Sequence, residues 1–439
     1  MSFFTARGPR LALWLCAALW FAFNLSRLLF DDADFEVLLA AARRWLQGAA
    51  LYVSEDNAFT YPPPLAMLLA PLALLPQAAG RIAFYLLSCA ALWLGVRLLH
   101  REVLPPQTPR RALIIAAALI GSLRFAQAVF DNQQMDGLVF CAVLAGAALW
   151  TRGRELWGAG CWALAAGLKA NPAFLVLLPL FRGRWRAAGI FAAALAALLL
   201  APDLLRPEFR AAPGAAFSMP KRVSEPGGEI ERFLLLPPGG RGHLGDFLRF
   251  NFATPGGQRH GGEARAEAED SAWWAAMQSG YLNQSLTRIA LRWLPFATGA
   301  GAFLFWCAAF GAALLLLCLL RRPAPFPLAL LGYGAFVLIG PVSSKPHFIA
   351  FYGLLLWCWA DLLRPARISR AGLAVLLPAT LLMGLTARGL VGSAASSALA
   401  SFGHIGLCAL GVWSYAFLRL FRESQRRVQF LAMRRGLAS

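Results

Sequence analysis

The sequence predicts an all-α polytopic membrane protein, and three observations lead to this fold class. Of its 439 residues, 59% are hydrophobic and only 14% are charged, with a mean hydropathy of +0.58. Soluble proteins usually carry about 25% charged residues. Apolar runs long enough to cross a bilayer recur along the chain: Leu11–Phe30, Ala112–Phe130, Ala187–Leu205, Thr298–Leu320, Ala371–Ala387 and Leu399–Leu420. Runs of this length predict about twelve transmembrane helices, within roughly 10 to 13.

The first apolar run follows Arg7 and Arg10, as in a secretory signal, but it has no clear cleavage site. We therefore expect it to be retained as the first membrane helix. The net charge of +19 can indicate nucleic-acid binding, but the basic residues stand in the gaps between apolar runs. This pattern favours a role in membrane topology and no nucleic-acid partner.

The basic clusters predict the orientation, because cytoplasmic loops carry an excess of Lys and Arg. The clusters lie around Arg7 and Arg10, and at Arg97–Arg111, Arg152–Arg154, Arg182–Arg186, Arg321–Arg322, Arg364–Arg370 and Arg419–Arg435. Assigning them to the cytoplasm places both termini on the cytoplasmic side of the membrane. The expected organisation is one polytopic membrane domain at 1–425, with outer loops at 31–80 and 206–296, and a basic cytoplasmic tail at 426–439.

The segment Glu155–Phe181 has basic clusters at both ends and the sequence Lys169-Ala170-Asn171-Pro172 at its centre. It predicts two half-length helices whose broken backbone lines a protein cavity. The long loop is rich in Gly and Pro and predicts partly irregular structure. The eight cysteines stand singly, so no disulfide framework is expected.

The first outer loop contains Asp31, Asp32 and Asp34, followed by an amphipathic stretch from Val37 to Gln47 that predicts a short interfacial helix ending at Gly48. A carboxylate at the membrane surface can acquire a pKa suited to a general base. Asp34 is our candidate. Solvation of these carboxylates, or capping of the following helix, is the alternative.

Three further polar features follow on the same predicted side. In the turn 131–136, Gln134 and Asp136 can form hydrogen bonds with sugar hydroxyls. The alternative is an ordinary polar turn between two helices. Lys169 suits an anionic group such as a phosphate, or extends to the interface. Lys345 and His347 suit a leaving phosphate, although a histidine at a helix start is often structural.

Asn283 and Gln284 follow a stretch with Trp273, Trp274 and Tyr281, and this mixture suits carbohydrate or a membrane interface. No phosphate-binding glycine motif and no His-Glu-x-x-His motif occurs in the sequence. We therefore expect no metal site and no cofactor, with any divalent metal dependence left open.

The order of several motifs resembles glycosyltransferase family 87, the polyprenyl-phosphate-mannose-dependent α-mannosyltransferases with the GT-C membrane fold. The resemblance runs from about residue 10 to about residue 360. It rests on Asp34-Phe35, Arg44 to Gly48, Leu51-Tyr52, Phe59-Thr60-Tyr61-Pro62-Pro63, Gln134-x-Asp136, Gly167-Leu168-Lys169-x-x-Pro172, Arg184-Trp185-Arg186, Asn283-Gln284-Ser285-Leu286 with Arg292, and His347. The chain departs from the family pattern at Asp136, which replaces an Asn, and around Ser344-Lys345-Pro346.

The resemblance implies a multi-pass protein of the bacterial plasma (inner) membrane that acts as a hexosyltransferase. It would move a sugar, mannose above all, from a polyprenyl-phosphate donor to a lipid or glycan acceptor, by inverting single displacement on the extracytoplasmic side. Asp34 and His347 would be catalytic. Lys169, Lys345 and Arg292 would bind the donor phosphate. Tyr61, Gln134, Asp136, Asn283 and Gln284 would bind sugar or acceptor.

Two alternatives stay open from the sequence. The same fold can use another polyprenyl-phosphate sugar, such as glucose or arabinofuranose. A membrane transporter of lipid or solute also accommodates buried charges and broken helices.

Overall fold

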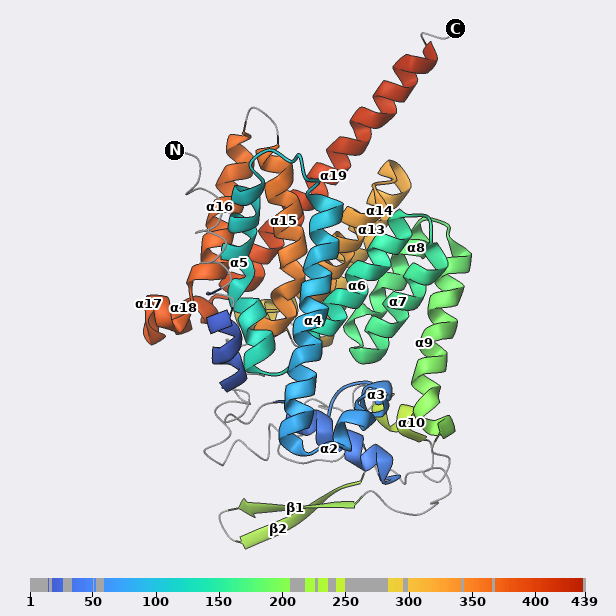
Figure 1. Ribbon diagram of the computed structural model, residues 1–439, viewed down its shortest axis with the longest axis vertical. Helices are drawn as coiled ribbons and strands as arrows, with labels where there is room; N and C mark the ends of the chain where they lie inside the picture. The colour runs from blue at the N-terminus through green and yellow to red at the C-terminus, as the bar shows by residue number, and fades with distance from the viewer. Residues whose placement is uncertain are drawn as a thin grey trace.

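The computed structural model describes residues 15, 18–26, 34–49, 51–52, 59–205, 218–225, 228–235, 242–248, 283–294, 299–340, 343–364 and 368–436. Within this part the chain is a bundle of helices, with shorter elements gathered at one end (Figure 1). The bundle consists of α4 (Gln77–Val103), α5 (Arg111–Asp131), α6 (Asp136–Thr151), α7 (Glu155–Leu168), α8 (Leu177–Phe181), α9 (Trp185–Leu205), α13 (Gly299–Arg321), α14 (Pro325–Ile339), α15 (Ala350–Leu363), α16 (Arg370–Leu385) and α19 (His404–Gly436).

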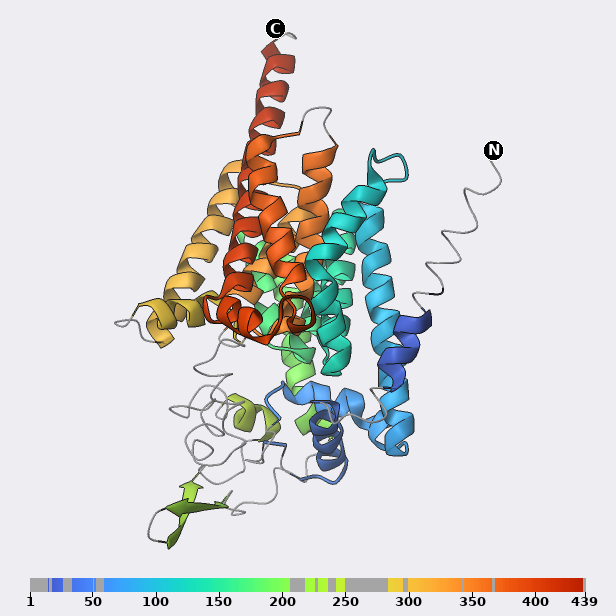
Figure 2. The same cartoon turned by 90° about the vertical axis from the view of Figure 1, so that its left-hand side faces the viewer.

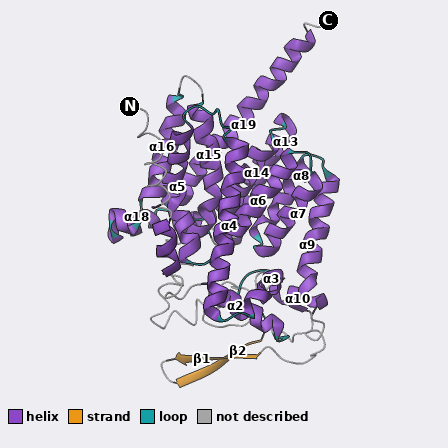
Figure 3. Cartoon of the chain, in the orientation of Figure 1, coloured by secondary structure: helices purple, strands orange, loops and turns teal. Residues whose placement is uncertain are grey.

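Shorter elements complete the described chain, as Figure 3 shows by secondary structure. They are α2 (Asp34–Leu46), α3 (Pro63–Ala73), η1 (Asn171–Val176), β1 (Ser218–Glu225), β2 (Gly228–Leu235), α10 (Gly242–Leu248), α12 (Leu286–Trp293), η4 (Lys345–Ile349), α17 (Arg388–Val391) and α18 (Ser393–Ser401).

Six helical segments in the described residues are long and apolar enough to cross a membrane. They are Gln77–Val103, Arg111–Asp131, Trp185–Leu205, Gly301–Arg321, Lys345–Leu363 and His404–Glu423. The predicted class of multi-pass helical membrane protein is therefore confirmed. The total of about twelve spans stays a prediction that rests on run length.

The bundle has an inner helix and lipid-facing outer helices. α14 is buried along nearly its whole length and packs against α6, α15 and α19. It is apolar on all sides, as expected for an interior helix. In contrast, Trp93 on α4, Leu204 on α9 and Leu304 on α13 are exposed. A bilayer would cover such outward apolar side chains.

The two ends of the bundle differ in character. The turns that follow α4, α6, α8, α13 and α15 lie at one end, together with the C-terminal part of α19 (Figures 1 and 2). These turns carry the basic clusters. Helices α2, α3 and α10 and the hairpin lie at the other end. The clusters therefore share one end, as predicted, and the assignment of that end to the cytoplasm stays a prediction.

Two of the basic turns use the same helix ending. Gly153 (φ 76°) follows α6 and Gly183 (φ 68°) follows α8. In each turn the glycine N–H donates to the carbonyl three residues earlier, and the next N–H donates five residues back. This double hydrogen bond satisfies the last helical carbonyls and needs a positive φ, which glycine adopts at least cost.

The long loop contains more regular structure than predicted. β1 and β2 pair antiparallel, from Ser218 opposite Leu235 to Glu225 opposite Gly228. The hairpin differs from the irregular structure expected for this loop, and the predicted all-α class holds for the membrane bundle. The loop also contributes α10, whose first N–H groups donate to the Asp203 carboxylate at the end of α9.

Two local predictions are confirmed. The amphipathic stretch forms α2, which ends at Leu46 ahead of Gly48 (φ 67°). The segment Glu155–Phe181 is broken after Leu168, and the chain continues as η1 and α8. Its backbone is extended at Lys169 (φ −153°, ψ 123°). This break gives Lys169 its position in the site.

Candidate functional site

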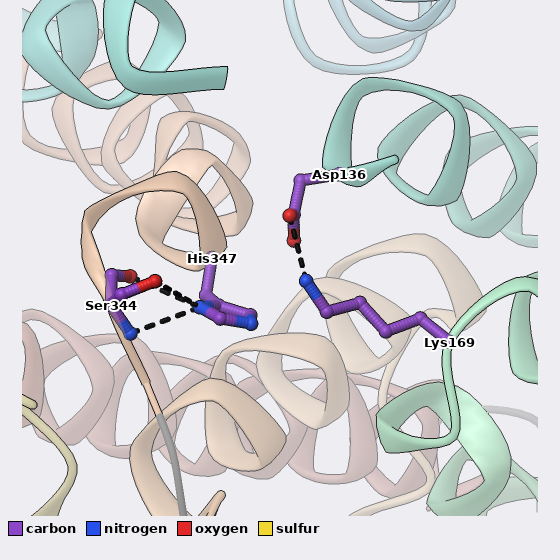
Figure 4. Close-up of polar contacts among 4 residues, drawn as sticks. All are labelled: Asp136, Lys169, Ser344 and His347. Atoms are coloured by element: carbon purple, nitrogen blue, oxygen red, sulfur yellow. Dashed lines mark hydrogen bonds and ion pairs between the residues drawn. The ribbon is translucent and has the colours of Figure 1, made fainter. Parts of the chain in front are cut away.

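A buried ion pair lies at the centre of the candidate site. Asp136 begins α6, and Lys169 stands at the break between α7 and η1. Lys169 Nζ lies 2.7 Å from Asp136 Oδ2, and only 3% of the Asp136 side chain is exposed (Figure 4). A buried charge is tolerated when it is paired and hydrogen-bonded. Each residue therefore supplies the partner that the other needs.

His347 faces this pair from η4. Its Nδ1 accepts a hydrogen bond from the Ser344 backbone N–H at 3.0 Å. Nδ1 also lies 3.2 Å from the Ser344 carbonyl. We assign the neutral tautomer in which Nδ1 accepts from the N–H and the proton lies on Nε2. The far side of the ring is turned toward Lys169 and Asp136 (Figure 4), close enough for electrostatic interaction. The site thus presents an N–H donor beside an ammonium group.

The segment directly before α3 reaches the same place through Tyr61. The Lys169 ammonium lies 5.8 Å from the centroid of the Tyr61 ring, within range of a cation–π contact. The Tyr52 hydroxyl donates to the Tyr61 carbonyl at 2.8 Å and so fixes this part of the loop. Tyr61 is therefore well placed to border a ligand held by Lys169.

Asp34 is the first residue of α2, and its side chain lies outside the described part. Its neighbour Phe35 stacks on Phe84 of α4, with ring centroids 4.5 Å apart. One turn further along α4, the Ser88 carbonyl lies against Gly137, the residue after Asp136. The start of α2 and the buried pair are therefore connected through one short stretch of α4.

Gln134 lies in the tight turn between α5 and α6. Its N–H donates to the Val129 carbonyl at 3.0 Å, after Gln133 takes a positive φ of 49°. The Gln134 side chain is buried. The structure therefore gives the turn a structural role in placing Asp136, beside the sugar-binding role predicted for Gln134.

Asn283 and Gln284 contact the protein's own backbone. Asn283 Oδ1 accepts hydrogen bonds from the N–H groups of Ser285 and Ser343, at 3.1 and 3.0 Å. Gln284 Nε2 donates to the Ala400 carbonyl at 2.9 Å. Both side chains are buried. In this structure they tie the start of α12 to neighbouring segments, and the sugar contacts expected from the sequence stay a prediction.

Arg292 also contacts the protein's own backbone. Its guanidinium donates to the carbonyls of Arg288, Ala400, Ser401 and Asn283. Burial lowers the pKa of Arg292 from its ordinary value, and the nearby Arg288 adds to this effect. The hydrogen bonds to carbonyls offset part of the cost of burying the charge. The predicted contact with a donor phosphate therefore competes with a structural role.

Lys345 lies on the same short helix as His347 but has different neighbours. Arg124, Arg388 and Asp131 are the charged groups that affect it. The structure thus brings Asp136, Lys169, His347 and Tyr61 together, whereas the charged neighbours of Lys345 are a different set of residues. Among the described residues, no group of three His, Cys, Asp or Glu side chains could hold a metal ion.

Some residues of the site were missed in the sequence. Tyr333, on the apolar helix α14, is buried and interacts electrostatically with Asp136. A tyrosine inside an apolar run gives no sequence signal that separates packing from function. Ser344 belonged to a recognised polar loop, and its spacing of three residues from His347 is that of a capping box.

The fold and the site define a multi-pass membrane protein with a buried charged centre at the end of the bundle opposite the basic turns. The model of Glycosyltransferase family 87 matches residues 59–218, which include Tyr61, Asp136 and Lys169. This match confirms the resemblance seen in the sequence over that segment.

Comparison with solved structures gives a crystal structure of ArnT from Cupriavidus metallidurans bound to undecaprenyl phosphate. That chain is 14% identical, with a TM-score of 0.41, and the alignment covers 95% of the present chain and 78% of ArnT. No curated protein matches the chain.

Proposed function

We propose that the protein transfers a hexose, most favourably mannose, from a polyprenyl-phosphate donor to a lipid or glycan acceptor on the extracytoplasmic side of the membrane. The observation that carries the proposal is the pairing of Lys169 with Asp136 beside the Nε2 face of His347. The family match over residues 59–218 supports the class of reaction. The location opposite the basic turns supports the extracytoplasmic side.

The proposed reaction is a single displacement. Asp34 removes the proton of the acceptor hydroxyl while the acceptor oxygen attacks the anomeric carbon of the sugar. The bond between that carbon and the phosphate oxygen breaks, and the polyprenyl phosphate leaves with the bonding electrons. Lys169 and the His347 Nε2–H would stabilise the negative charge on the phosphate. Phosphate needs mainly this charge stabilisation, so no metal is part of the proposal.

Asp136 would act as a positioning residue. Its carboxylate holds the Lys169 ammonium at the break between α7 and η1, and thereby fixes where the charge is presented. The pairing also lowers the cost of burying the Lys169 ammonium, because a buried ammonium without a partner is strongly destabilising. Tyr61 would border the sugar or the phosphate on the outer side.

The test is transfer from radiolabelled polyprenyl-phosphate-mannose by the purified protein in nanodiscs. Asp34→Asn should abolish transfer and His347→Ala should reduce it about 10²- to 10³-fold, whereas Arg322→Gln at the opposite end should retain it. Donors carrying glucose or arabinofuranose identify the sugar. Full transfer by the Asp34→Asn variant would show that Asp34 is not the base. Movement of substrate across vesicles without a new glycosidic bond would instead indicate a transporter, which the broken helix at Lys169 also suits.

A further inference from the structure

A second charged cluster lies on the other side of η4, formed by Arg124, Lys345 and Arg388. Lys345 interacts electrostatically with Arg124 and with Arg388. The cluster joins three elements that are distant in sequence: α5, η4 and α17. α5 packs against both η4 and α16, and α17 begins soon after α16 ends.

Arg124 lies inside a span, about two turns or roughly 10 Å before the end of α5. Its Nη1 donates to Thr386 Oγ1 at 2.7 Å and to the Met383 carbonyl at 3.4 Å. These bonds hold the guanidinium at the end of α16, next to Arg388. An arginine at this depth is costly and marks a functional site by default.

The cluster is not neutralised within the described residues. There, neither Lys345 nor Arg388 has a hydrogen-bond or ion-pair partner for its side chain, and both hydrogen bonds of Arg124 come from Nη1. The only carboxylate that affects Lys345 in this part is Asp131. Three cations and one carboxylate leave an excess of two positive charges. Like charges that are held close together repel each other, so a bound anion would stabilise the cluster.

The surroundings indicate an anion with an apolar chain. Leu123 beside Arg124, Leu385 at the end of α16, and Leu390 and Val391 after Arg388 are all exposed. On a membrane protein these side chains face lipid. A head group would meet the cations while its chain lies along the apolar side chains, the arrangement of basic lipid-binding pockets between helices.

We propose that Arg124, Lys345 and Arg388 form a binding site for a lipid phosphate, separate from the Asp136–Lys169–His347 centre. An excess of two positive charges matches a phosphate monoester, which carries nearly two negative charges at neutral pH. The identity of this monoester rests on the proposed function, in which it is the polyprenyl phosphate that remains after the sugar has been transferred. Bilayer phospholipid is the other source of the same chemistry.

The test is a thermal-shift titration of the purified full chain, with no sugar donor present. The probes are undecaprenyl phosphate, phosphatidylglycerol and inorganic phosphate. We expect undecaprenyl phosphate to raise Tm, and Lys345→Gln and Arg388→Gln each to weaken its binding about tenfold or more, as for loss of one charge-assisted contact. Arg388→Lys and Arg322→Gln should bind as the wild type does. Arg388 is exposed, so its substitution leaves the packed core intact.

Equal binding by the wild type and both glutamine variants would overturn the site, and so would an equal effect of inorganic phosphate. An equal effect of phosphatidylglycerol, lost in both variants, would support the site and identify bilayer phospholipid as its source. The readout involves no transfer reaction. If undecaprenyl phosphate binds and the variants weaken its binding, but a separate assay shows no sugar transfer from any donor, the proposed function alone is refuted. If the protein transfers sugar but the variants bind undecaprenyl phosphate as the wild type does, the site alone is refuted.

Discussion

Asn283 Oδ1 accepts a hydrogen bond from the Ser343 backbone N–H at 3.0 Å and joins the start of α12 to the loop that carries His347. The Gln284 N–H donates to the Ser343 carbonyl at 2.9 Å, so both backbone groups of Ser343 are held. Ser344, the next residue, caps η4 and contacts His347 Nδ1. We infer that Asn283 positions His347 from a distance.

Asn283→Ala should lower both Tm and kcat and leave the KM for the donor nearly unchanged. The substitution leaves the buried N–H groups of Ser285 and Ser343 without this acceptor, at a cost of about 1–3 kcal/mol. Thermal unfolding and steady-state transfer rates measure the two effects. Ser285→Ala, which removes the N-cap of α12, is the control and should cost about 1 kcal/mol of stability with kcat retained. A raised KM with an unchanged Tm would instead support the sugar contact predicted from the sequence.

Asp136→Asn and Lys169→Met should each destabilise the protein by about 3–5 kcal/mol, because each leaves one buried charge without its partner. The double variant should be more stable than either single variant, since it buries no charge. Denaturant or thermal unfolding of all four proteins in the same detergent gives the coupling between the two sites. Additive losses would show that the pair contributes no coupling energy.

His347→Ala should reduce kcat about 10²- to 10³-fold, as expected for loss of one donor to a developing anion. Ser344→Ala should reduce it only a few-fold, because the backbone N–H of Ser344 still holds Nδ1. Single-turnover transfer rates at saturating donor compare the two variants. Losses of equal size would mean that the serine hydroxyl, rather than the ring, carries the effect.

Gly384→Ala should destabilise the bundle by about 1–3 kcal/mol through overpacking. A Cβ at this position would overlap the Ile120 carbonyl on α5, so α5 and α16 would have to separate. That movement would also loosen the contact between Arg124 and Thr386. Gly189→Ala on α9 is the control, since open space surrounds it and alanine favours helix by up to about 1 kcal/mol. Equal Tm values for the two variants would contradict the close approach of the helices.

Local features of the chain were predicted well. Hydropathy predicts the apolar runs and the amphipathic helix α2, and helix-ending residues predict the break at Lys169. These signals depend only on a few neighbouring residues in the sequence. The hairpin β1–β2 was missed because a short polar pairing in a long loop gives little periodicity. The motif resemblance named Tyr61, Asp136, Lys169 and His347 among the site residues, but it did not predict that Asp136 pairs with Lys169.

The sequence by itself determined three features of this protein: its location in a membrane, the position of the helix break at Lys169, and which turns are basic. Each depends only on residues that are close together in the sequence, such as an apolar run long enough to cross a bilayer or a helix-breaking segment. Only the tertiary structure decided which charges neutralise each other. Lys169 pairs with Asp136, Arg292 donates to backbone carbonyls, and Arg124 and Arg388 lie near Lys345. Helix packing brings these distant residues together, and a charge at low dielectric then depends on whichever partner lies within reach.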